Sequence, residues 1–141
     1  MSPPPHPPLR IGTYAAALVV IVLVGLLSRL RPIGLWLYDK SLGDALYAVA
    51  VYLVLALLLR RRTPAALGVL TFVLSACIEA FQLTGFAARH AAFPPVRWLL
   101  GTHFAWHDLV CYALGAAGVA LSDAAARTRA SSVTRGPDDH R

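Results

Sequence analysis

The stretch Ser75–Gly85, SACIEAFQLTG, ends a long apolar run and yet carries Glu79 and Gln82, three positions apart. Positions three or four apart share one side of a helix, so Thr71, Ser75, Glu79 and Gln82 form a single polar stripe. A glutamate in an apolar helix is costly unless it faces the interior of a helix bundle. The stretch therefore predicts a membrane helix whose polar stripe points toward neighbouring helices.

The composition of the 141-residue chain is typical of a membrane protein. Hydrophobic residues make up 57% and charged residues 14% of it, and the mean hydropathy is +0.61. Soluble domains contain roughly 45–50% apolar and about 25% charged residues. The net charge is +6, but the basic residues stand between apolar runs and form no basic helix face with interleaved aromatic residues. We therefore expect the lipid bilayer, and not a nucleic acid, as partner.

Four apolar runs predict an all-α, four-helix integral membrane bundle. The runs cover residues 11–28, 45–59, about 64–84 and about 105–126. Each is close to the length that a spanning helix needs, with polar flanks completing the shorter ones. We expect a transmembrane domain over 11–126, a disordered proline-rich segment over 1–10 and a disordered cytoplasmic tail over 127–141.

Four spans place both termini on the same side of the membrane. Eight basic residues then lie on that side and five on the other, and three consecutive arginines, 60–62, occupy a very short loop. The positive-inside rule predicts that both termini are cytoplasmic. The ends of the runs that carry most of the acidic residues would then face outward.

Acidic residues gather at these outward ends. Four of the seven acidic residues lie there: Asp39, Asp44, Glu79 and Asp108. In the fourth run, a stripe of small and polar residues consists of Asp108, Cys111, Gly115, Gly118 and Ser122. The simplest assembly turns these faces inward around an outward-facing polar pocket. The candidate ligand-binding residues are Asp44, Glu79, Gln82, Asp108 and, from the following loop, Arg89 and Arg97.

Structural roles compete with these assignments. A buried pair between Glu79 and a loop arginine, or a network of Glu79 with Gln82, would only fix helix packing. Asp44 and Asp108 each stand near the start of a predicted helix and could act as N-cap carboxylates. The sequence leaves both interpretations open.

Metal and thiol chemistry has weaker signals. His103 and His107 have a spacing that can bind a metal on one helix face, but both lie in or beside a predicted loop, so we expect no metal and no other cofactor. Cys77 and Cys111 both lie inside apolar runs at similar predicted depth and are interpreted as buried free thiols that could touch.

Three segments, in order, resemble a known family. GDALYAVAVYL (43–53), IEAFQL (78–83) and HDLVCYALGA (107–116) are similar to the small bacterial membrane family called domain of unknown function 2809, over about residues 38–121. That family in turn resembles the VanZ-like proteins. These share a D-K pair before the second helix, E-x-x-Q at the end of the third, and D-x-x-x-N-x-x-G opening the fourth.

The VanZ-like motifs map onto this chain with two departures. Asp39-Lys40 resembles the D-K pair, Glu79 and Gln82 match E-x-x-Q, and Asp108 and Gly115 match the Asp and Gly of the third motif. Tyr112 stands at the position of the Asn, and Asp44 is the polar residue nearest to the position of a VanZ-like His. The resemblance implies a bacterial plasma-membrane protein of four helices. For VanZ-like proteins it also implies a link to glycopeptide (teicoplanin) tolerance at the cell envelope.

Three functions follow as hypotheses. The first is a non-enzymatic envelope protein whose pocket binds a lipid-linked or cell-wall component, with arginines meeting phosphate. The second is a membrane enzyme acting on such a substrate, with Glu79 and Asp108 as an acid/base pair, because paired carboxylates can hold different pKa values. The third is a structural or assembly subunit whose polar stripes only specify helix pairing. A small bundle of this kind is also compatible with a homo-oligomer.

Overall fold

The computed structural model describes residues 11–30, 34, 36–89, 92 and 105–134. The helices in these ranges are α1 (Ile11–Leu30), α2 (Trp36–Leu58), α3 (Pro64–Gln82), the short α4 (Phe86–Arg89) and α6 (Trp106–Thr134). The described residues contain no β-strand. Four of the helices are long and apolar enough to cross a bilayer. The protein is therefore an all-α, four-helix membrane bundle, as predicted, and the four spans fit a multi-pass membrane protein.

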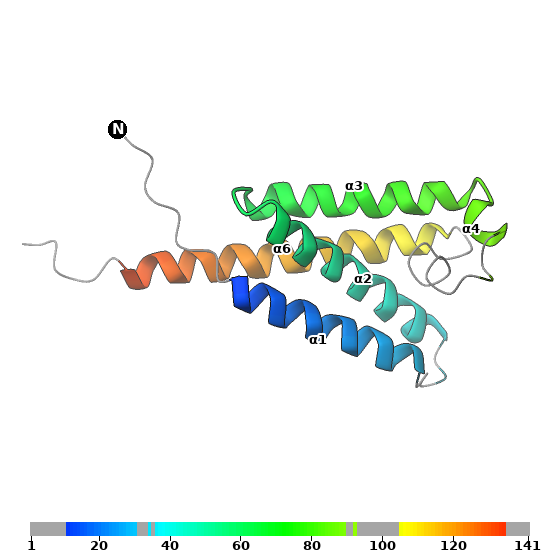
Figure 1. Cartoon of the computed structure of the whole chain (residues 1–141), viewed down its shortest axis with the longest axis horizontal. Helices are drawn as coiled ribbons and strands as arrows, with labels where there is room; N and C mark the ends of the chain where they lie inside the picture. Colours follow the sequence, from blue (N-terminus) through cyan, green and yellow to red (C-terminus); the bar gives the residue numbers. More distant parts are fainter. Residues whose placement is uncertain (1–10, 31–33, 35, 90–91, 93–104, 135–141) are drawn as a thin grey trace, which may run out of the picture.

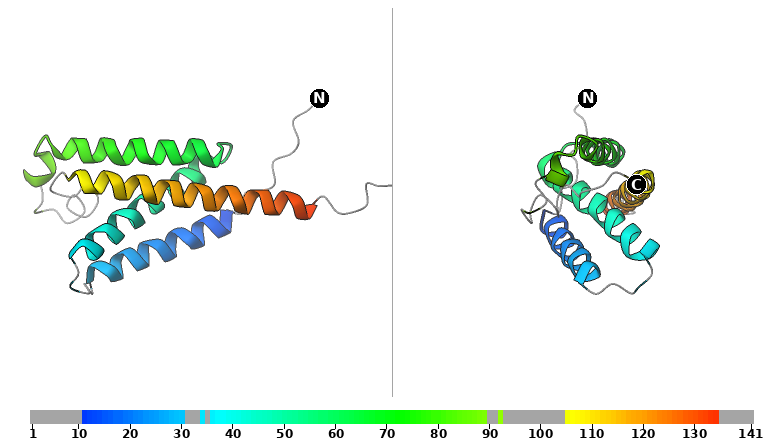
Figure 2. Two further views of the ribbon diagram at one scale, coloured as in Figure 1. Left: turned by 180° about the vertical axis from the view of Figure 1, so that it is seen from behind. Right: turned by 90° about the vertical axis from the view of Figure 1, so that its right-hand side faces the viewer.

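Each long helix packs against at least one other long helix, and α2 contacts all three of the others. α1 lies along α2, α2 also contacts α6 and α3, and α3 lies along α6 (Figure 1). The start of α1, the turn between α2 and α3 and the end of α6 lie at one end of the bundle, which we call the terminal end (Figures 1 and 2). The end of α3, the helix α4 and the start of α6 lie at the other, the α4 end. One group of polar residues, around Glu79, lies at the α4 end, and a second, around Asp123, lies at the terminal end.

Local sequence signals set the limits of α3. Thr63 is its N-cap, and the Thr63 Oγ1 accepts a hydrogen bond from the backbone amide of Ala66 at 3.2 Å. Pro64 follows at the first helical position, where its missing amide hydrogen costs nothing. Beyond the last turn, Gly85 has a φ of +69°, a left-handed conformation that glycine adopts without strain, and the chain reverses there into α4. α3 is thereby held at a defined length between the two ends.

Small residues let the helices approach closely in the core. Tyr52, Leu53, Ala56, Leu67 and Ala120 form a buried cluster where α2, α3 and α6 meet. A Cβ atom added to Gly68 would lie 3.0 Å from the Cβ of Ala120. Membrane helices associate through such contacts, because lipid supplies little hydrophobic drive for helix pairing.

The buried face of α6 differs in part from the predicted stripe. Asp108, Cys111 and Gly115 face the interior, but nothing lies within 4 Å of a Cβ added to Gly118, and Ser122 is exposed. The Ser122 hydroxyl donates to the Gly118 carbonyl of its own helix at 2.8 Å. Toward the terminal end the buried face continues instead through Tyr112, Ala116, Ala120 and Asp123.

Two helices are longer than their apolar runs. α2 begins at Trp36, so Asp44 lies inside the helix and is not its N-cap. α6 continues to Thr134, so residues 127–134 are helical rather than part of a disordered tail. Arg127 forms an ion pair with Asp123 one turn earlier, at 2.9 Å, which supports this extension. The predicted segments 1–10 and 135–141 lie outside the described residues.

Candidate functional site

Glu79 is completely buried and joins α3 to the start of α6. Its Oε1 accepts a hydrogen bond from the backbone amide of Ala105 at 2.8 Å. Its Oε2 accepts from Gln82 Nε2 at 3.2 Å and from the Tyr112 hydroxyl at 3.2 Å. Three donors therefore compensate the cost of burying this carboxyl group. The carboxylate also lies beside the N-terminus of α6, where the helix dipole favours negative charge.

The structure tests only one of the two loop arginines, Arg89 and Arg97, that were predicted as alternative partners of Glu79. Arg89 is exposed, and its guanidinium donates to the backbone carbonyls of Thr84 at 3.0 Å and Gly85 at 3.3 Å. Arg89 thus stabilises the turn before α4 and does not pair with Glu79. Arg97 lies outside the described residues.

The other predicted carboxylates come close to Glu79. Asp108 is the third residue of α6, in its first turn, so it is not the N-cap, and it is only 5% exposed. Asp44 is half-buried on α2. The Tyr112 hydroxyl donates to Glu79, Asp108 lies one turn before Tyr112 on α6, and a carboxylate oxygen of Asp44 lies within 4.8 Å of the Cys111 sulfur. Three helices therefore bring the four groups together at the α4 end, and Gln82 joins them through Glu79.

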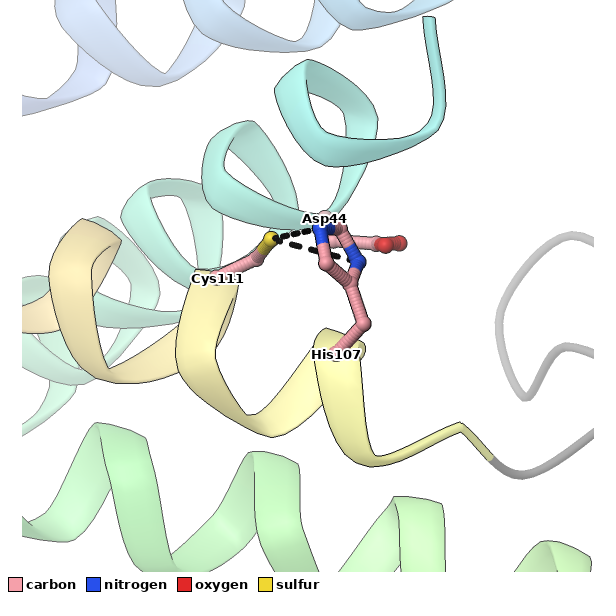
Figure 3. Close-up of side chains that lie close together, drawn as sticks. All are labelled: Asp44, His107 and Cys111. Atoms are coloured by element: carbon pink, nitrogen blue, oxygen red, sulfur yellow. Dashed lines mark hydrogen bonds between the residues drawn. The ribbon is translucent and has the colours of Figure 1, made fainter. Parts of the chain in front are cut away.

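A thiol and an imidazole extend this group. The Cys111 Sγ lies 3.7 Å from each ring nitrogen of His107, one turn earlier on α6. The His107 Nε2 lies 3.1 Å from the Ser41 hydroxyl of α2, and its Nδ1 lies 3.6 Å from Asp108 Oδ1. Asp44 faces the same two side chains across the α2–α6 contact (Figure 3). Thiol, imidazole and carboxylate together offer metal-ligating or acid–base chemistry.

Sequence reasoning missed the pair of His107 and Cys111. From the sequence, His107 was considered with His103, which lies outside the described residues, and with Asp108 or Glu79, but Cys111 was interpreted as an inert buried thiol. The spacing of four between His107 and Cys111 was the available signal, because it places both on one helix face. Neither cysteine forms a disulfide. The prediction that both thiols are buried is confirmed for Cys111 and wrong for Cys77, which is exposed on α3.

A second polar cluster closes the terminal end. Asp123 accepts hydrogen bonds from the hydroxyls of Tyr14 of α1 and Tyr52 of α2, the latter at 2.6 Å. Arg127 donates to both carboxylate oxygens of Asp123, at 3.2 and 2.9 Å, and to the Arg62 carbonyl at 3.2 Å. Asp123 thus ties α6 to α1 and α2, Arg127 ties α6 to the turn before α3, and the cluster serves packing.

The polar stripe predicted on α3 is buried along its whole length. Thr71, Ser75 and Glu79 are 0% exposed, and Gln82 is buried as well. Within the described part of the chain, the hydroxyls of Thr71 and Ser75 have no hydrogen-bond partner. The stripe leads from the carboxylates at the α4 end toward the core cluster.

Most of the polar residues described above lie in a region that matches a known protein family. The family model DUF2809, described as a protein of unknown function, matches residues 33–116, well over half of the chain. The chain belongs to the DUF2809 family. The region matched by the DUF2809 model contains α2, α3 and the first part of α6. It therefore includes the polar residues described around Glu79 at the α4 end, namely Ser41, Asp44, Glu79, Gln82, His107, Asp108, Cys111 and Tyr112. Asp123 and Arg127 of the terminal end lie outside it. No curated protein and no solved structure matches the chain.

Proposed function

We propose that this member of the DUF2809 family is a bacterial envelope protein that binds the polar head of a lipid-linked component at its α4 end. The observation that supports the proposal is the hydrogen bond between Tyr112 and buried Glu79, with Asp108 one turn away on α6 and Asp44 of α2 beside Cys111. Carboxylates accept hydrogen bonds from hydroxyl and amino groups, and a phenol can donate or accept them. Sugar and amine heads of lipids carry those groups.

The surroundings of the group suit a ligand anchored in lipid. The outward faces of the helices carry large apolar side chains, as Leu27, Leu70 and Leu114 illustrate. Exposed Arg89 lies at the same end and uses Nε and one terminal nitrogen for the turn. Its other terminal nitrogen can meet a phosphate, and Arg97 keeps the same proposed role.

The likeness to VanZ-like proteins makes the proposal more specific. The matches at Glu79, Gln82, Asp108 and Gly115 support a role in glycopeptide tolerance in the plasma membrane. The arginines at 60–62 support cytoplasmic termini, which would place the α4 end outside the cell.

A membrane enzyme acting on the same kind of substrate is the second candidate. Glu79 and Asp108 are both buried, but their surroundings differ, since Glu79 accepts three hydrogen bonds and Asp108 lies in the first turn of α6 beside His107. Two carboxylates in different surroundings can serve as acid and base. The tight bonding of Glu79 to the fold favours the binding protein over the enzyme.

Teicoplanin susceptibility tests the proposed function. Wild type, Asp108→Asn and Glu79→Gln are expressed at matched membrane levels in a sensitive Gram-positive host, with Cys77→Ser, an exposed site on α3, as the control. We expect wild type and the control to raise tolerance severalfold and both carboxylate variants to lose the gain. A wild type without any gain, present in the membrane as folded protein, would overturn the proposal.

The orientation is checked in the same host. A reporter fused at Arg61 should report a cytoplasmic position. An external position would turn the acidic α4 end toward the cytoplasm and exclude contact with envelope components on the outer face. Reduced folded yield of the carboxylate variants, with no other change, would instead indicate the structural-subunit hypothesis.

A further inference from the structure

Three side chains with metal-binding atoms converge between α2 and α6. Asp44 comes from α2, and His107 and Cys111 come from successive turns of α6 (Figure 3). A carboxylate oxygen, a ring nitrogen and the thiol sulfur all lie within 4.8 Å of one another. We call these three residues the Asp44–His107–Cys111 cluster.

We propose that the Asp44–His107–Cys111 cluster binds a zinc-class divalent ion through three protein ligands, with a fourth position left for an external ligand. Tetrahedral zinc with Zn–S of about 2.3 Å and Zn–N of about 2.0–2.1 Å separates those two ligands by about 3.6 Å. The observed separation between Cys111 Sγ and either nitrogen of His107 is 3.7 Å. The sulfur-to-nitrogen separation therefore matches that of a zinc site. Because the sulfur is equally far from both nitrogens, binding requires the ring to turn one nitrogen toward the ion and the Asp44 carboxylate to meet the ion from α2.

The charge of the cluster also fits a divalent cation. Bound Cys111 is a thiolate and bound His107 is neutral, so with the Asp44 carboxylate the ligands carry two negative charges. One divalent cation cancels them, which removes the cost of holding these charges between apolar helices. Asp108 lies beside His107 and adds negative potential nearby. The thiolate favours zinc over magnesium or calcium, which prefer oxygen ligands.

The surrounding contacts hold the ligands in place. The Ser41 hydroxyl lies 3.1 Å from His107 Nε2 and the Asp108 Oδ1 lies 3.6 Å from Nδ1. If the ring turns about the Ser41 contact, Nδ1 is the nitrogen that meets the ion, and Ser41 then serves as the outer partner of this ligand. A Cβ added to Gly115 would lie 2.6 Å from the Ala45 carbonyl oxygen, so α2 and α6 are in close contact beside Asp44. This contact brings the carboxylate of one helix to the thiol of the other.

Cobalt binding to the full chain in detergent micelles tests the proposal. Purified protein is stripped with a chelator and titrated with Co²⁺, whose bond to a thiolate gives a charge-transfer band in the near ultraviolet. We expect one Co²⁺ per chain in wild type and in Cys77→Ser, the control thiol. Cys111→Ser should lose the band. Loss of even an outer partner of a metal ligand costs about 10–100-fold in affinity, so Asp44→Asn and His107→Gln should bind at least about 100-fold more weakly.

The outcomes separate cleanly. A wild type without the band, or a band that Cys111→Ser retains, overturns the proposal. If Cys111→Ser does not fold, Cys77→Ser leaves Cys111 as the one thiol of the chain. Added Zn²⁺ should then slow its alkylation in the folded protein at least about tenfold, and Asp44→Asn should remove most of this protection. Alkylation at an unchanged rate with Zn²⁺ present also overturns the proposal.

Discussion

Gly115→Ala compared with Gly118→Ala measures how closely α2 and α6 must approach. The two glycines stand one turn apart on α6, and the change adds one methyl group to each. At Gly115 the new Cβ would meet the Ala45 carbonyl oxygen at 2.6 Å and the Ala48 Cβ at 3.1 Å. At Gly118 it would meet nothing within 4 Å. The obstacle at Gly115 is backbone, so only a shift of one helix against the other relieves it.

The magnitude follows from two opposing terms. Replacing glycine by alanine in a helix stabilises by roughly 0.5–1 kcal/mol, and both variants share this gain. Gly115→Ala adds an overpacking cost of about 1–3 kcal/mol. The shared gain cancels in the comparison, so Gly115→Ala should be less stable than Gly118→Ala by about 1–3 kcal/mol, with Gly118→Ala at or slightly above wild type.

Equilibrium unfolding in mixed detergent micelles, followed by circular dichroism, measures this difference. Gly115→Ala should also weaken Co²⁺ binding at the Asp44–His107–Cys111 cluster, since moving α2 outward carries Asp44 away from α6. Gly118→Ala should leave Co²⁺ binding unchanged. A Gly115→Ala protein as stable as Gly118→Ala would refute the reasoning, because it would mean that the contact at Ala45 imposes no limit on the distance between α2 and α6.

Two further predictions concern the buried carboxylates. Tyr52→Phe removes a hydrogen-bond donor from the charged, buried Asp123. The free energy of unfolding should fall by about 1–2 kcal/mol, which lies between the typical value of about 0.6 kcal/mol for a hydrogen bond in a membrane protein and the larger value for a bond to a charged group. An unchanged free energy of unfolding would show that Arg127 alone satisfies the carboxylate. Glu79→Ala leaves three donors without an acceptor and should cost at least about 3 kcal/mol. Glu79→Gln keeps an oxygen for the Ala105 amide and should cost about half as much, and equal losses in the same unfolding assay would contradict this role of the amide contact.

The sequence predicted the four helices and the stripe on α3 because both depend on local patterns. An apolar run of sufficient length specifies a span, and a spacing of three to four specifies a face. Thr71, Ser75, Glu79 and Gln82 were placed on one interior face from spacing alone, and all four are buried. The extra length of α2 and α6 was missed, since polar residues such as Lys40 and Arg127 end the apolar signal before the helix ends.

The partners within the site could not be predicted in the same way. Glu79 binds the amide of Ala105, and a backbone group has no signature in the sequence. The meeting of Asp44 with His107 and Cys111 depends on how far α2 slides along α6 and how each is rotated. Those quantities are set by contacts such as Gly115 against Ala45, which involve residues far apart in the chain.

The cluster around Asp123 has a consequence for the order of assembly in the membrane. Translation delivers α1 and α2 first, with the hydroxyls of Tyr14 and Tyr52 among their apolar side chains, and delivers Asp123 only in the second half of the last helix. Until α6 inserts, neither phenol has its acceptor, and afterwards one carboxylate joins the first, second and last helices at once. A chain that stops before Asp123 therefore leaves both phenols in the apolar part of the bundle without their native acceptor, so α1 and α2 reach their final pairing only once the last helix is in place.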